Sequence, residues 1–213
     1  MIYGKQPVTE AERGRRRVHR VWRAPETPTE ELERLCGSPD HQGVVAEVDP
    51  YPYADPGRLL TPPDALLVAL DQVQDPRNLG AVCRSAEFAG AAGVVIPDRR
   101  SAEVTAVACK ASAGAVEHLE VARVRNLADW LGEAKAAGFW IWGADAEASS
   151  PPWEADLSGP TVLVLGGEGK GIRPRVASVC DGLVALPRRG KVDSLNVSAA
   201  AATLLFEALR QRG

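Results

Sequence analysis

The sequence predicts an α/β protein whose parallel sheet is covered by helices on both faces, with a small α/β appendage before it. From residue 64 onward, short apolar runs alternate with amphipathic stretches, a pattern typical of a buried parallel sheet. The chain has 213 residues, 45% hydrophobic and 25% charged, which is enough for one ordinary domain core and a small extra unit. A proline-rich stretch separates these two parts.

The larger unit, residues 64–213, is expected to alternate strands with helices. The apolar runs expected to form strands are residues 66–70, 93–96, 119–124, 139–143, 161–165 and 183–186. The stretches expected to form helices are residues 79–89, 102–112, 127–137, 173–179 and 195–210. This pattern fixes a fold class but names no chemistry.

Residues 1–48 are expected to form the small unit, with helices at 10–16 and 29–35 and extended segments at 18–22 and 43–48. A unit of this size does not readily fold alone. Residues 49–63 carry closely spaced prolines, which exclude a regular helix and indicate a linker.

The net charge of −3 and the pI of about 5.7 argue, taken globally, against a nucleic-acid partner. The distribution of charge points the other way. Arginines crowd the first segment, and basic residues surround the last strand-to-helix loop; the candidates are Arg15, Arg16, Arg17, Arg188, Arg189 and Lys191. A single run of this kind is as well explained by a solvated helix face, but two basic patches favour RNA.

The four cysteines are widely separated, without a CxxC pair, and the chain has three histidines. This pattern indicates neither a zinc site nor a disulfide scaffold, so we expect buried, reduced thiols. The apolar runs are far shorter than the roughly 20 residues that cross a bilayer, and residues 1–10 lack a signal-peptide core. We therefore expect a soluble, cytoplasmic protein.

Three polar segments interrupt the apolar pattern where a strand should pass into a helix: residues 78–80 with Arg84, residues 166–171, and residues 194–198. Polar groups at the carboxyl ends of parallel strands usually serve a ligand. The middle segment is rich in glycine, but it lacks both the Gly-x-Gly-x-x-Gly spacing and the Ser or Thr of a P-loop. Glu168 within it would also repel a phosphate. A tight glycine turn is the alternative explanation.

These segments resemble the three motifs of the SpoU/TrmH branch of the SPOUT RNA methyltransferases. The motifs read Asp-Pro-Arg-Asn-Leu-Gly-Ala-Val-Cys-Arg-Ser-Ala at 75–86, Leu-Gly-Gly-Glu-Gly-Lys-Gly-Ile at 165–172, and Leu-Pro at 186–187 followed by Ser-Leu-Asn-Val-Ser at 194–198. The resemblance covers residues 64–213. Residues 2–4 and 41–46 also resemble members with an N-terminal substrate-binding domain related to ribosomal protein L30e, here shortened.

The resemblance implies a C-terminal deep trefoil knot, a homodimer, and S-adenosyl-L-methionine bound within the knot. Patterning alone gives an ordinary doubly wound sheet, because true knots are rare. By carry-over of the motifs, Gly166, Leu186 and Leu195 line the cofactor pocket, largely through their main chain. The apolar, Ala-rich stretch 199–209 is explained either as a core helix or as a dimer face, and the resemblance favours the dimer.

The reaction implied is methyl transfer to a ribose 2′-hydroxyl, for which the protein aligns the groups and no metal is required. Arg84 is the family's proposed base. A guanidinium keeps its proton because its pKa exceeds about 12, so we interpret Arg84 first as an electrostatic group that stabilises the developing alkoxide and grips the neighbouring phosphate.

The other polar residues of the motifs would support Arg84. Asn78 is expected at the N-cap of its helix, where it also positions Arg84 or the ribose. Glu168 and Asn196 would orient Arg84 and the loops, and Ser194 would contact the RNA or the cofactor carboxylate. Ser198 is equally well explained as a first-turn helix residue.

The leading hypothesis is an RNA ribose 2′-O-methyltransferase acting on 23S ribosomal RNA, with transfer RNA as the second substrate candidate. A knotted RNA-binding or assembly protein without catalysis is disfavoured because Asn78, Arg84, Glu168, Ser194 and Asn196 are all present. A nicotinamide-dependent oxidoreductase is weaker still, since the glycine fingerprint is missing. RNA would contact the arginine-rich N-terminal segments of two subunits.

Overall fold

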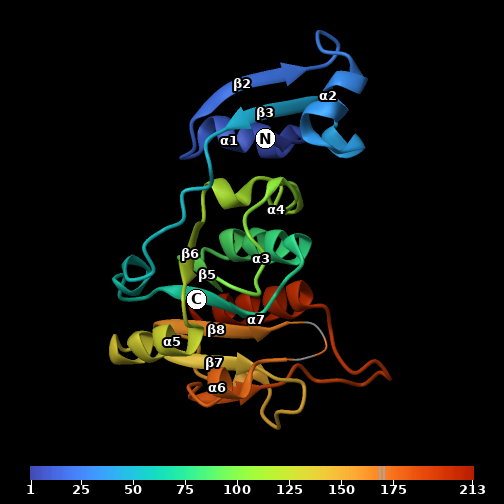
Figure 1. Cartoon of the computed structure of the whole chain (residues 1–213). Coiled ribbons are helices and arrows are strands. Elements are labelled where there is room, and N and C mark those ends of the chain that lie inside the picture. The colour runs from blue at the N-terminus through green and yellow to red at the C-terminus, as the bar shows by residue number, and fades with distance from the viewer. Residues whose placement is uncertain (168, 170) are drawn as a thin grey trace.

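The chain forms two sheets, a small one near the N-terminus and a larger one in the remainder (Figure 1). The structure is a computed structural model, and it describes all residues except 168 and 170. Glu168, one of the expected site residues, thus lies outside the described residues. No helix within the described part of the chain has the length and apolar character needed to cross a membrane.

The small sheet is antiparallel and has the strand order β1-β3-β2. Its elements are β1 (Ile2–Tyr3), α1 (Lys5–Arg13), β2 (Val18–Arg23), α2 (Thr29–Cys36), a 3₁₀ turn (Pro39–His41) and β3 (Val44–Val48). Side chains alternate across β3: Val44 and Ala46 pack with α1, whereas Val45 packs with Leu32 of α2. The two helices therefore cover opposite faces of the sheet.

The expected linker is packed against the larger unit instead of connecting the two parts freely. Ala54 forms a parallel bridge to Ala122, and its amide donates to the Val121 carbonyl at 2.9 Å. A 3₁₀ turn at Arg58–Leu60 buries Leu59, which is 2% exposed. The prolines do exclude a long helix, but the aromatic and leucine side chains between them join the core of the larger sheet.

Within the described residues, the larger sheet contains six strands, all parallel, in the order β6-β5-β4-β8-β7-β9. The strands are β4 (Leu66–Asp71), β5 (Gly93–Pro97), β6 (Glu120–Val124), β7 (Trp140–Ala144), β8 (Thr161–Gly166) and β9 (Gly182–Val184). The helices are α3 (Pro76–Phe88), α4 (Ala106–Ala111), α5 (Leu127–Ala136), α6 (Pro174–Ala177) and α7 (Val197–Gln211), with 3₁₀ turns at Ala115–Glu117 and Pro152–Glu154.

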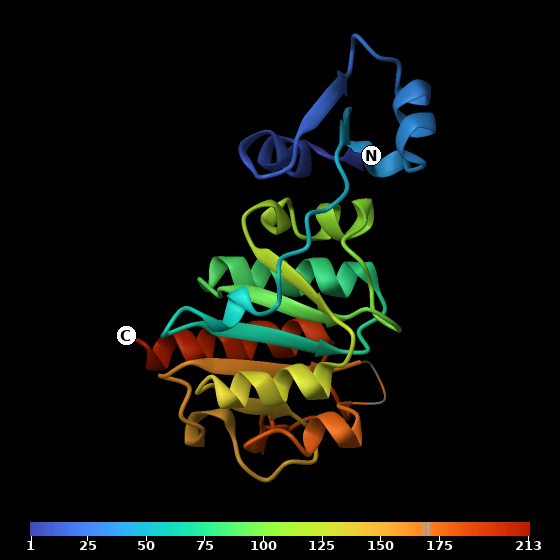
Figure 2. The same ribbon diagram turned by 60° about the vertical axis from the view of Figure 1, so that its left-hand side comes forward.

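Helices cover both faces of this sheet, as the sequence predicts (Figures 1 and 2). One core cluster joins α3, α4 and α7 to one face, and a second joins α5 and α6 to the other. The small sheet lies on the far side of α4 from the larger sheet, and α1 of the small unit faces α4 (Figure 2). The strand order places the carboxyl ends of β4, β8, β7 and β9 side by side, where ligands bind in open α/β sheets.

The expected strands and helices of the larger unit are all present, with shifted ends. The expected helix 102–112 is shortened to α4, because the Thr105 hydroxyl caps it by accepting from the Ala108 amide at 3.4 Å. In the small unit, the first helix is α1, which starts earlier than expected and stops before Gly14, and the two-residue β1 was not predicted. The knot stays a prediction.

Candidate active site

Two of the polar segments meet in space although they lie far apart in the chain. The Asn196 Nδ2 atom donates a hydrogen bond to the Asn78 Oδ1 atom at 3.0 Å, across a separation of 118 residues. Asn78 belongs to α3 and Asn196 immediately precedes α7. The contact joins the beginnings of two helices that follow different strands.

Asn196 is the N-cap of α7 as well as the partner of Asn78. Its Oδ1 atom accepts from the Ser198 amide at 2.8 Å and from the Ser198 hydroxyl at 2.6 Å. Asparagine favours this position because its side chain satisfies an amide that has no partner within the helix. One side chain therefore starts α7 with its oxygen and reaches α3 with its nitrogen, while Ser198 is a first-turn residue.

The prediction that Asn78 caps α3 is wrong. Asp75 is the N-cap, and its Oδ1 atom accepts from the Arg77 amide at 2.8 Å, with Pro76 at the first helical position. Proline suits that position because its fixed φ is helical and its missing amide proton would have no partner there. The helix therefore begins three residues earlier than expected, and the Asn78 side chain contacts Asn196 instead of capping α3.

Helices α3 and α7 run parallel and in register. Ten residues beyond each asparagine, the rings of Phe88 and Phe206 approach with centroids 6.0 Å apart. The positive ends of both helix dipoles therefore lie together at the asparagine pair. An electron-rich ligand group, such as a phosphate or an ionising hydroxyl, is favoured at this place.

Arg84 lies on α3 about 9 Å along the helix axis from Asn78. Its side chain is exposed and makes no hydrogen bond or ion pair with any residue that the structure describes. The adjacent Cys83 is fully buried. Among the described residues, the structure thus joins Asn78 to Asn196 and leaves the Arg84 side chain exposed to solvent.

The glycine segment closes tightly on itself at the end of β8. A Cβ atom on Gly166 would lie 2.0 Å from the Gly171 carbonyl carbon, and the Gly171 amide donates to the Gly167 carbonyl at 3.1 Å. A side chain at residue 166 would therefore prevent this turn. The close approach of the two backbone segments therefore requires glycine at residue 166.

Asp71 and Arg173 support this turn, and sequence reasoning did not single them out. Asp71 ends β4 opposite Gly166, is 0% exposed, and accepts from the Arg173 amide and Nε atom, each at 2.8 Å. A carboxylate ending the fully apolar run 66–70 is the signal that could have found it, because buried acids are almost always paired.

The loop between β9 and α7 carries the remaining expected residues. Leu186 is half-buried, whereas Ser194 is exposed and Leu195 is 59% exposed. Val192 is 76% exposed, so this loop presents apolar side chains to solvent beside the capped start of α7. Exposed apolar side chains next to hydrogen-bonding main chain suit an amphipathic ligand.

Comparison with known proteins identifies the family. The model of the SpoU rRNA Methylase family matches residues 65–206, and the model of the RNA 2′-O ribose methyltransferase substrate-binding domain matches residues 24–54.

The chain belongs to the SpoU rRNA Methylase family.

Relatives support this assignment over most of the chain. An uncharacterized tRNA/rRNA methyltransferase of Mycolicibacterium smegmatis is 49% identical over 193 residues, which cover 88% of this chain and 61% of the relative. YacO of Bacillus subtilis, named as a TrmH family tRNA/rRNA methyltransferase, is 38% identical over 238 residues, covering 99% of this chain and 95% of the relative. The chain thus spans about 61% of the length of its mycobacterial relatives.

Solved SpoU structures share the fold. The SpoU methyltransferase AviRb of Streptomyces viridochromogenes, in complex with AdoMet, has a TM-score of 0.83 and 28% identity over 99% of this chain and 89% of that one. An AdoMet-bound rRNA methyltransferase of Sinorhizobium meliloti has a TM-score of 0.86 and 25% identity over 98% of this chain and 85% of that one.

One expected RNA-binding residue of this SpoU chain is misassigned. Arg16 is 8% exposed, and its Nε atom donates to the Glu117 carboxylate at 2.9 Å, with a second bond from Nη2 to the same carboxylate. The guanidinium also lies 5.5 Å from the centre of the Tyr51 ring. Arg16 therefore joins the small unit to the larger one and is not available to RNA.

The other arginines expected to bind RNA lie at the surface. Arg17 and Arg189 are exposed. Arg15 donates to the Leu119 carbonyl at 2.8 Å, and Arg188 pairs with Asp193 at 2.9 Å within the β9–α7 loop. Arg188 thus stabilises the loop that carries Ser194.

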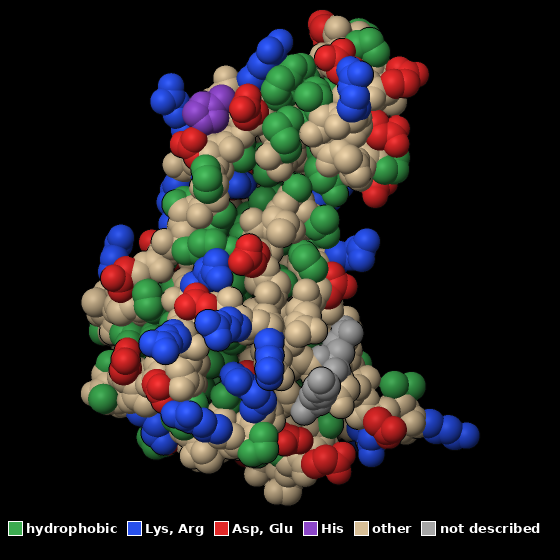
Figure 3. Space-filling view, viewed as in Figure 1, with side chains coloured by type: hydrophobic (Ala, Val, Ile, Leu, Met, Phe, Trp, Pro, Cys, Tyr) green, Lys and Arg blue, Asp and Glu red, His purple; other side chains and the backbone are tan. Residues whose placement is uncertain are grey.

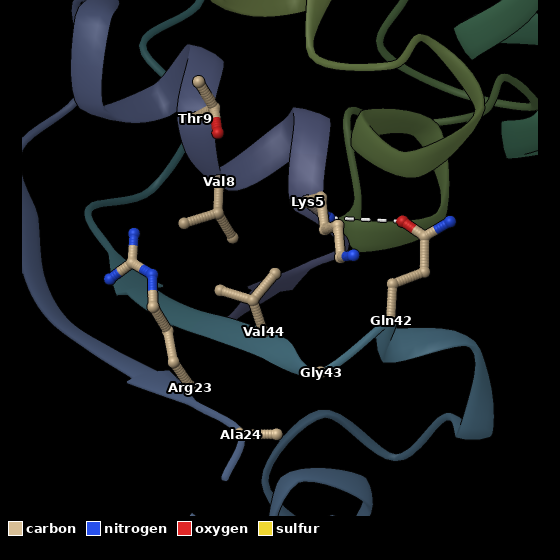
Figure 4. A pocket seen from close by; sticks show the side chains of 8 residues that line it. All are labelled: Lys5, Val8, Thr9, Arg23, Ala24, Gln42, Gly43 and Val44. Atoms are coloured by element: carbon tan, nitrogen blue, oxygen red, sulfur yellow. Dashed lines mark hydrogen bonds between the residues drawn. The ribbon is translucent and has the colours of Figure 1, made fainter. Parts of the chain in front are cut away.

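A pocket of about 470 Å³ lies in the small unit, between α1 and the strands β2 and β3 (Figure 4). Lys5 and Arg23 border it, and the Lys5 amide donates to the Gln42 Oε1 atom at 3.2 Å along one side (Figure 4). The Asn78–Asn196 pair lies in the other unit, so the pocket is separate from the candidate active site.

All four cysteines are free; Cys83 and Cys109 are buried, whereas Cys36 and Cys180 are partly exposed. Burial raises the pKa of Cys83 to about 12 and that of Cys180 to about 11. These thiols therefore stay protonated at neutral pH. Among the described residues, no group of three or more His, Cys, Asp or Glu side chains could hold a metal ion.

Proposed function

We propose that this SpoU chain transfers a methyl group from S-adenosyl-L-methionine to a ribose 2′-hydroxyl of RNA. The observation that carries the proposal is the Asn78–Asn196 contact. It brings two segments of the three-motif pattern together at the positive ends of α3 and α7. The glycine turn follows β8, the strand next to β4, and α3 also carries Arg84, which has no hydrogen bond or ion pair with the residues that the structure describes.

The residues at the end of the sheet fit S-adenosylmethionine. The glycine turn exposes main chain at Gly166, and the β9–α7 loop offers Leu186 and the exposed Leu195. These groups would hold the cofactor through main-chain hydrogen bonds and apolar contacts, within the knot that we propose for this part of the chain. When bound, S-adenosylmethionine supplies an activated methyl group. Solved relatives of similar fold are named as AdoMet-bound.

Arg84 would act on the RNA side of the reaction. Because its guanidinium stays protonated, it stabilises the negative charge that develops on the ribose oxygen and holds the adjacent phosphate through two parallel hydrogen bonds. Asn78 and Asn196 keep the beginnings of α3 and α7 fixed relative to each other, and Ser194 lies on the neighbouring loop to contact RNA or cofactor. We also assign Glu168 to this site, from the motif alone.

Ribosomal RNA of the large subunit is the proposed substrate, and transfer RNA is the alternative outcome of the test. The family model for the RNA 2′-O ribose methyltransferase substrate-binding domain matches residues 24–54, which include α2 and β3 of the small unit. The resemblance of residues 2–4 and 41–46 to the L30e-related domain supports our proposal that the small unit is a shortened form of that domain. Arg15, Arg17, Arg188 and Arg189 would contribute contacts to phosphates.

We propose a homodimer formed through the face that α3 and α7 share. Phe88 is 76% exposed, Phe206 45% and Leu209 40%. Large exposed apolar side chains that touch one another mark an interaction surface. A second copy placed there would bring another N-terminal unit, with its arginines, to the same RNA.

The test is methyl transfer from labelled S-adenosylmethionine to separated ribosomal and transfer RNA, with wild type, Arg84→Ala and Arg58→Ala. Arg58 is exposed and lies just before β4, at the opposite edge of the sheet. Label in ribosomal RNA that Arg84→Ala lowers by about 10²–10³-fold, with Arg58→Ala unchanged, supports the proposal. Label in transfer RNA alone would correct the substrate, and absence of cofactor binding would overturn the proposal.

A further inference from the structure

Arginine follows the carboxyl ends of four neighbouring strands of the larger sheet. In the order β6, β5, β4 and β8, the residues are Arg125, Arg99 with Arg100, Arg77, and Arg173. The ends of parallel strands form one edge of a sheet, and three strand spacings of about 4.8 Å give a row about 15 Å long. The segments that carry these arginines therefore follow neighbouring strand ends, although 96 residues separate Arg77 from Arg173 in the chain.

Hydrogen bonds fix the loops of this edge to one another. The Asp98 amide donates to the Val124 carbonyl at 2.8 Å, joining the loop after β5 to the last residue of β6. The Ala102 amide donates to the Val73 carbonyl at 2.8 Å, joining the loops after β5 and β4. Ordered loops present their side chains as one surface, at less entropic cost than separate flexible segments.

Four of these arginines, which we call the carboxyl-edge arginines, are exposed: Arg77, Arg99, Arg100 and Arg125. Within the described part of the chain, none of their side chains forms an ion pair or a hydrogen bond. The nearby acids are already engaged. Asp98 and Glu103 both pair with Arg123, Asp71 pairs with Arg173, and Asp75 caps α3.

The surface is therefore locally basic in a chain whose net charge is −3. Figure 3 shows Lys and Arg side chains gathered over the part of the molecule where β6, α5 and β8 lie in Figure 1. Unpaired arginines are costly to gather without a partner, because like charges repel. A polyanion with evenly spaced charges would relieve that repulsion.

This edge is continuous with the candidate active site. Arg77 is adjacent to Asn78, and Arg77 and Arg84 are seven residues apart on α3, so they lie on the same side of that helix. A strand that runs along the carboxyl-edge arginines therefore reaches Arg84 and the asparagine pair.

We propose that the carboxyl-edge arginines bind the phosphates of the RNA strand that flanks the methylated ribose. This inference rests on the proposed function and extends the site from Arg77, within the 75–86 motif, to Arg99, Arg100 and Arg125, which lie outside the three motifs. Guanidinium groups suit it because each can hold a phosphate through two parallel hydrogen bonds. Phosphate contacts position a strand without reading its sequence, so the surface sets affinity and leaves the choice of nucleotide to other contacts.

The experiment measures binding of a fluorescein-labelled oligouridine RNA by anisotropy between about 50 and 200 mM salt. The variants are Arg99→Gln, Arg125→Gln and the double variant, compared with Arg58→Gln, which removes one exposed arginine from the opposite edge of the same sheet. S-adenosylmethionine binding and methyl transfer to total RNA are measured in parallel for each protein.

Each substitution of a carboxyl-edge arginine is expected to weaken RNA binding roughly three- to tenfold and to reduce the slope of log affinity against log salt by about 0.7. Arg58→Gln is expected to leave both the affinity and the slope at their wild-type values. The double variant should lose about twice the slope, and S-adenosylmethionine binding should not change. If the Arg99→Gln and Arg125→Gln variants match Arg58→Gln in affinity and slope, the inference is overturned. Methyl transfer by the wild type would in that case still support the proposed function. A different outcome is that the wild type transfers no methyl group while the Arg99→Gln and Arg125→Gln variants still lose RNA affinity. That result would support the RNA-binding surface and reject the proposed function.

Discussion

The Arg16–Glu117 contact and the Asn78–Asn196 contact both join distant segments, over 101 and 118 residues respectively, yet they differ in water access and charge. The Arg16 and Glu117 side chains are 4% and 1% exposed, and they neutralise each other. The asparagines are uncharged and lie nearer to solvent, and the neighbouring Arg84 has no ion pair among the described residues. The difference distinguishes Arg16, which stabilises the fold, from Arg84, for which we propose a role in binding RNA.

The buried contact explains how the small unit stays attached to the larger one. Burial alone would lower the pKa of Arg16, but hydrogen bonds and charge from Glu117 and Cys109 raise it above its ordinary value. The Tyr51 hydroxyl donates to the Val116 carbonyl at 2.9 Å, and His118 contacts Glu10 at 2.8 Å at the margin of the same interface. Charged groups withdrawn from water stabilise a structure only as complete, hydrogen-bonded pairs.

The largest expected effect comes from breaking the buried pair. Glu117→Gln leaves the Arg16 charge uncompensated and is expected to lower the free energy of unfolding by about 3–5 kcal/mol, measured by urea denaturation. The matched control is Glu120→Gln, which removes the partly exposed Arg15–Glu120 pair at 3.4 Å and should cost less than about 1 kcal/mol. Equal losses in the two variants would contradict the distinction between the contacts.

The next effect concerns the exposed arginine. Arg84→Lys keeps the charge but loses the fork that grips a phosphate, so methyl transfer is expected to fall about ten- to a hundredfold. The free energy of unfolding should stay within about 0.5 kcal/mol, because the side chain lies at the surface. A loss of stability that matched the loss of activity would show that Arg84 holds the fold, as Arg16 does.

Two substitutions of Asn196 can separate its role as the cap of α7 from its hydrogen bond to Asn78. Asn196→Ala removes both the cap of α7 and the bond to Asn78 and is expected to cost about 2 kcal/mol in thermal or urea unfolding. Asn196→Asp keeps an oxygen for the Ser198 amide but no donor for Asn78, so it should retain most of the stability while slowing methyl transfer. Wild-type activity in Asn196→Asp would show that the contact between the helices is not needed for the reaction.

The smallest effect uses pH to probe the buried side of α3. Burial raises the pKa of Cys83 from its ordinary 9.0 to about 12. The contribution of the protonated thiol to the free energy of unfolding is therefore complete below pH 9 and is lost as pH rises towards 12. At pH 10 the loss is about 1.4 kcal/mol relative to pH 8. Cys83→Ala should reduce the difference in unfolding free energy between these two pH values by that amount, and an unchanged difference would refute the assignment.

The sequence predicts the strands well because each is an apolar run with a clear end, as in residues 66–70. The start of α3 was also readable: Asp75-Pro76 is a capping residue followed by the proline of a first helical position. The motif drew attention to Asn78 instead. Such local signals fix elements more reliably than they fix the roles of single residues.

Other features depend on contacts between remote segments. Arg15, Arg16 and Arg17 are chemically identical in the sequence, and burial of Arg16 alone follows from how α1 meets the turn at Ala115–Glu117. Predicting the Asn78–Asn196 hydrogen bond requires the order of β4, β8, β7 and β9 in the sheet. The pattern of apolar residues in the sequence does not give this order. Sequence reasoning did not group Arg99, Arg100 and Arg125 with Arg77, because these arginines follow different strands and lie far apart in the chain.

The most direct test of the account is to place the transferred methyl group on the nucleotide. RNA labelled by the wild type with S-adenosylmethionine is digested with alkali, which cannot cleave next to a methylated 2′-oxygen. The account predicts label in an alkali-resistant dinucleotide, absent when Arg84→Ala replaces the wild type. Label recovered in mononucleotides, as methylation of a base would give, would contradict it.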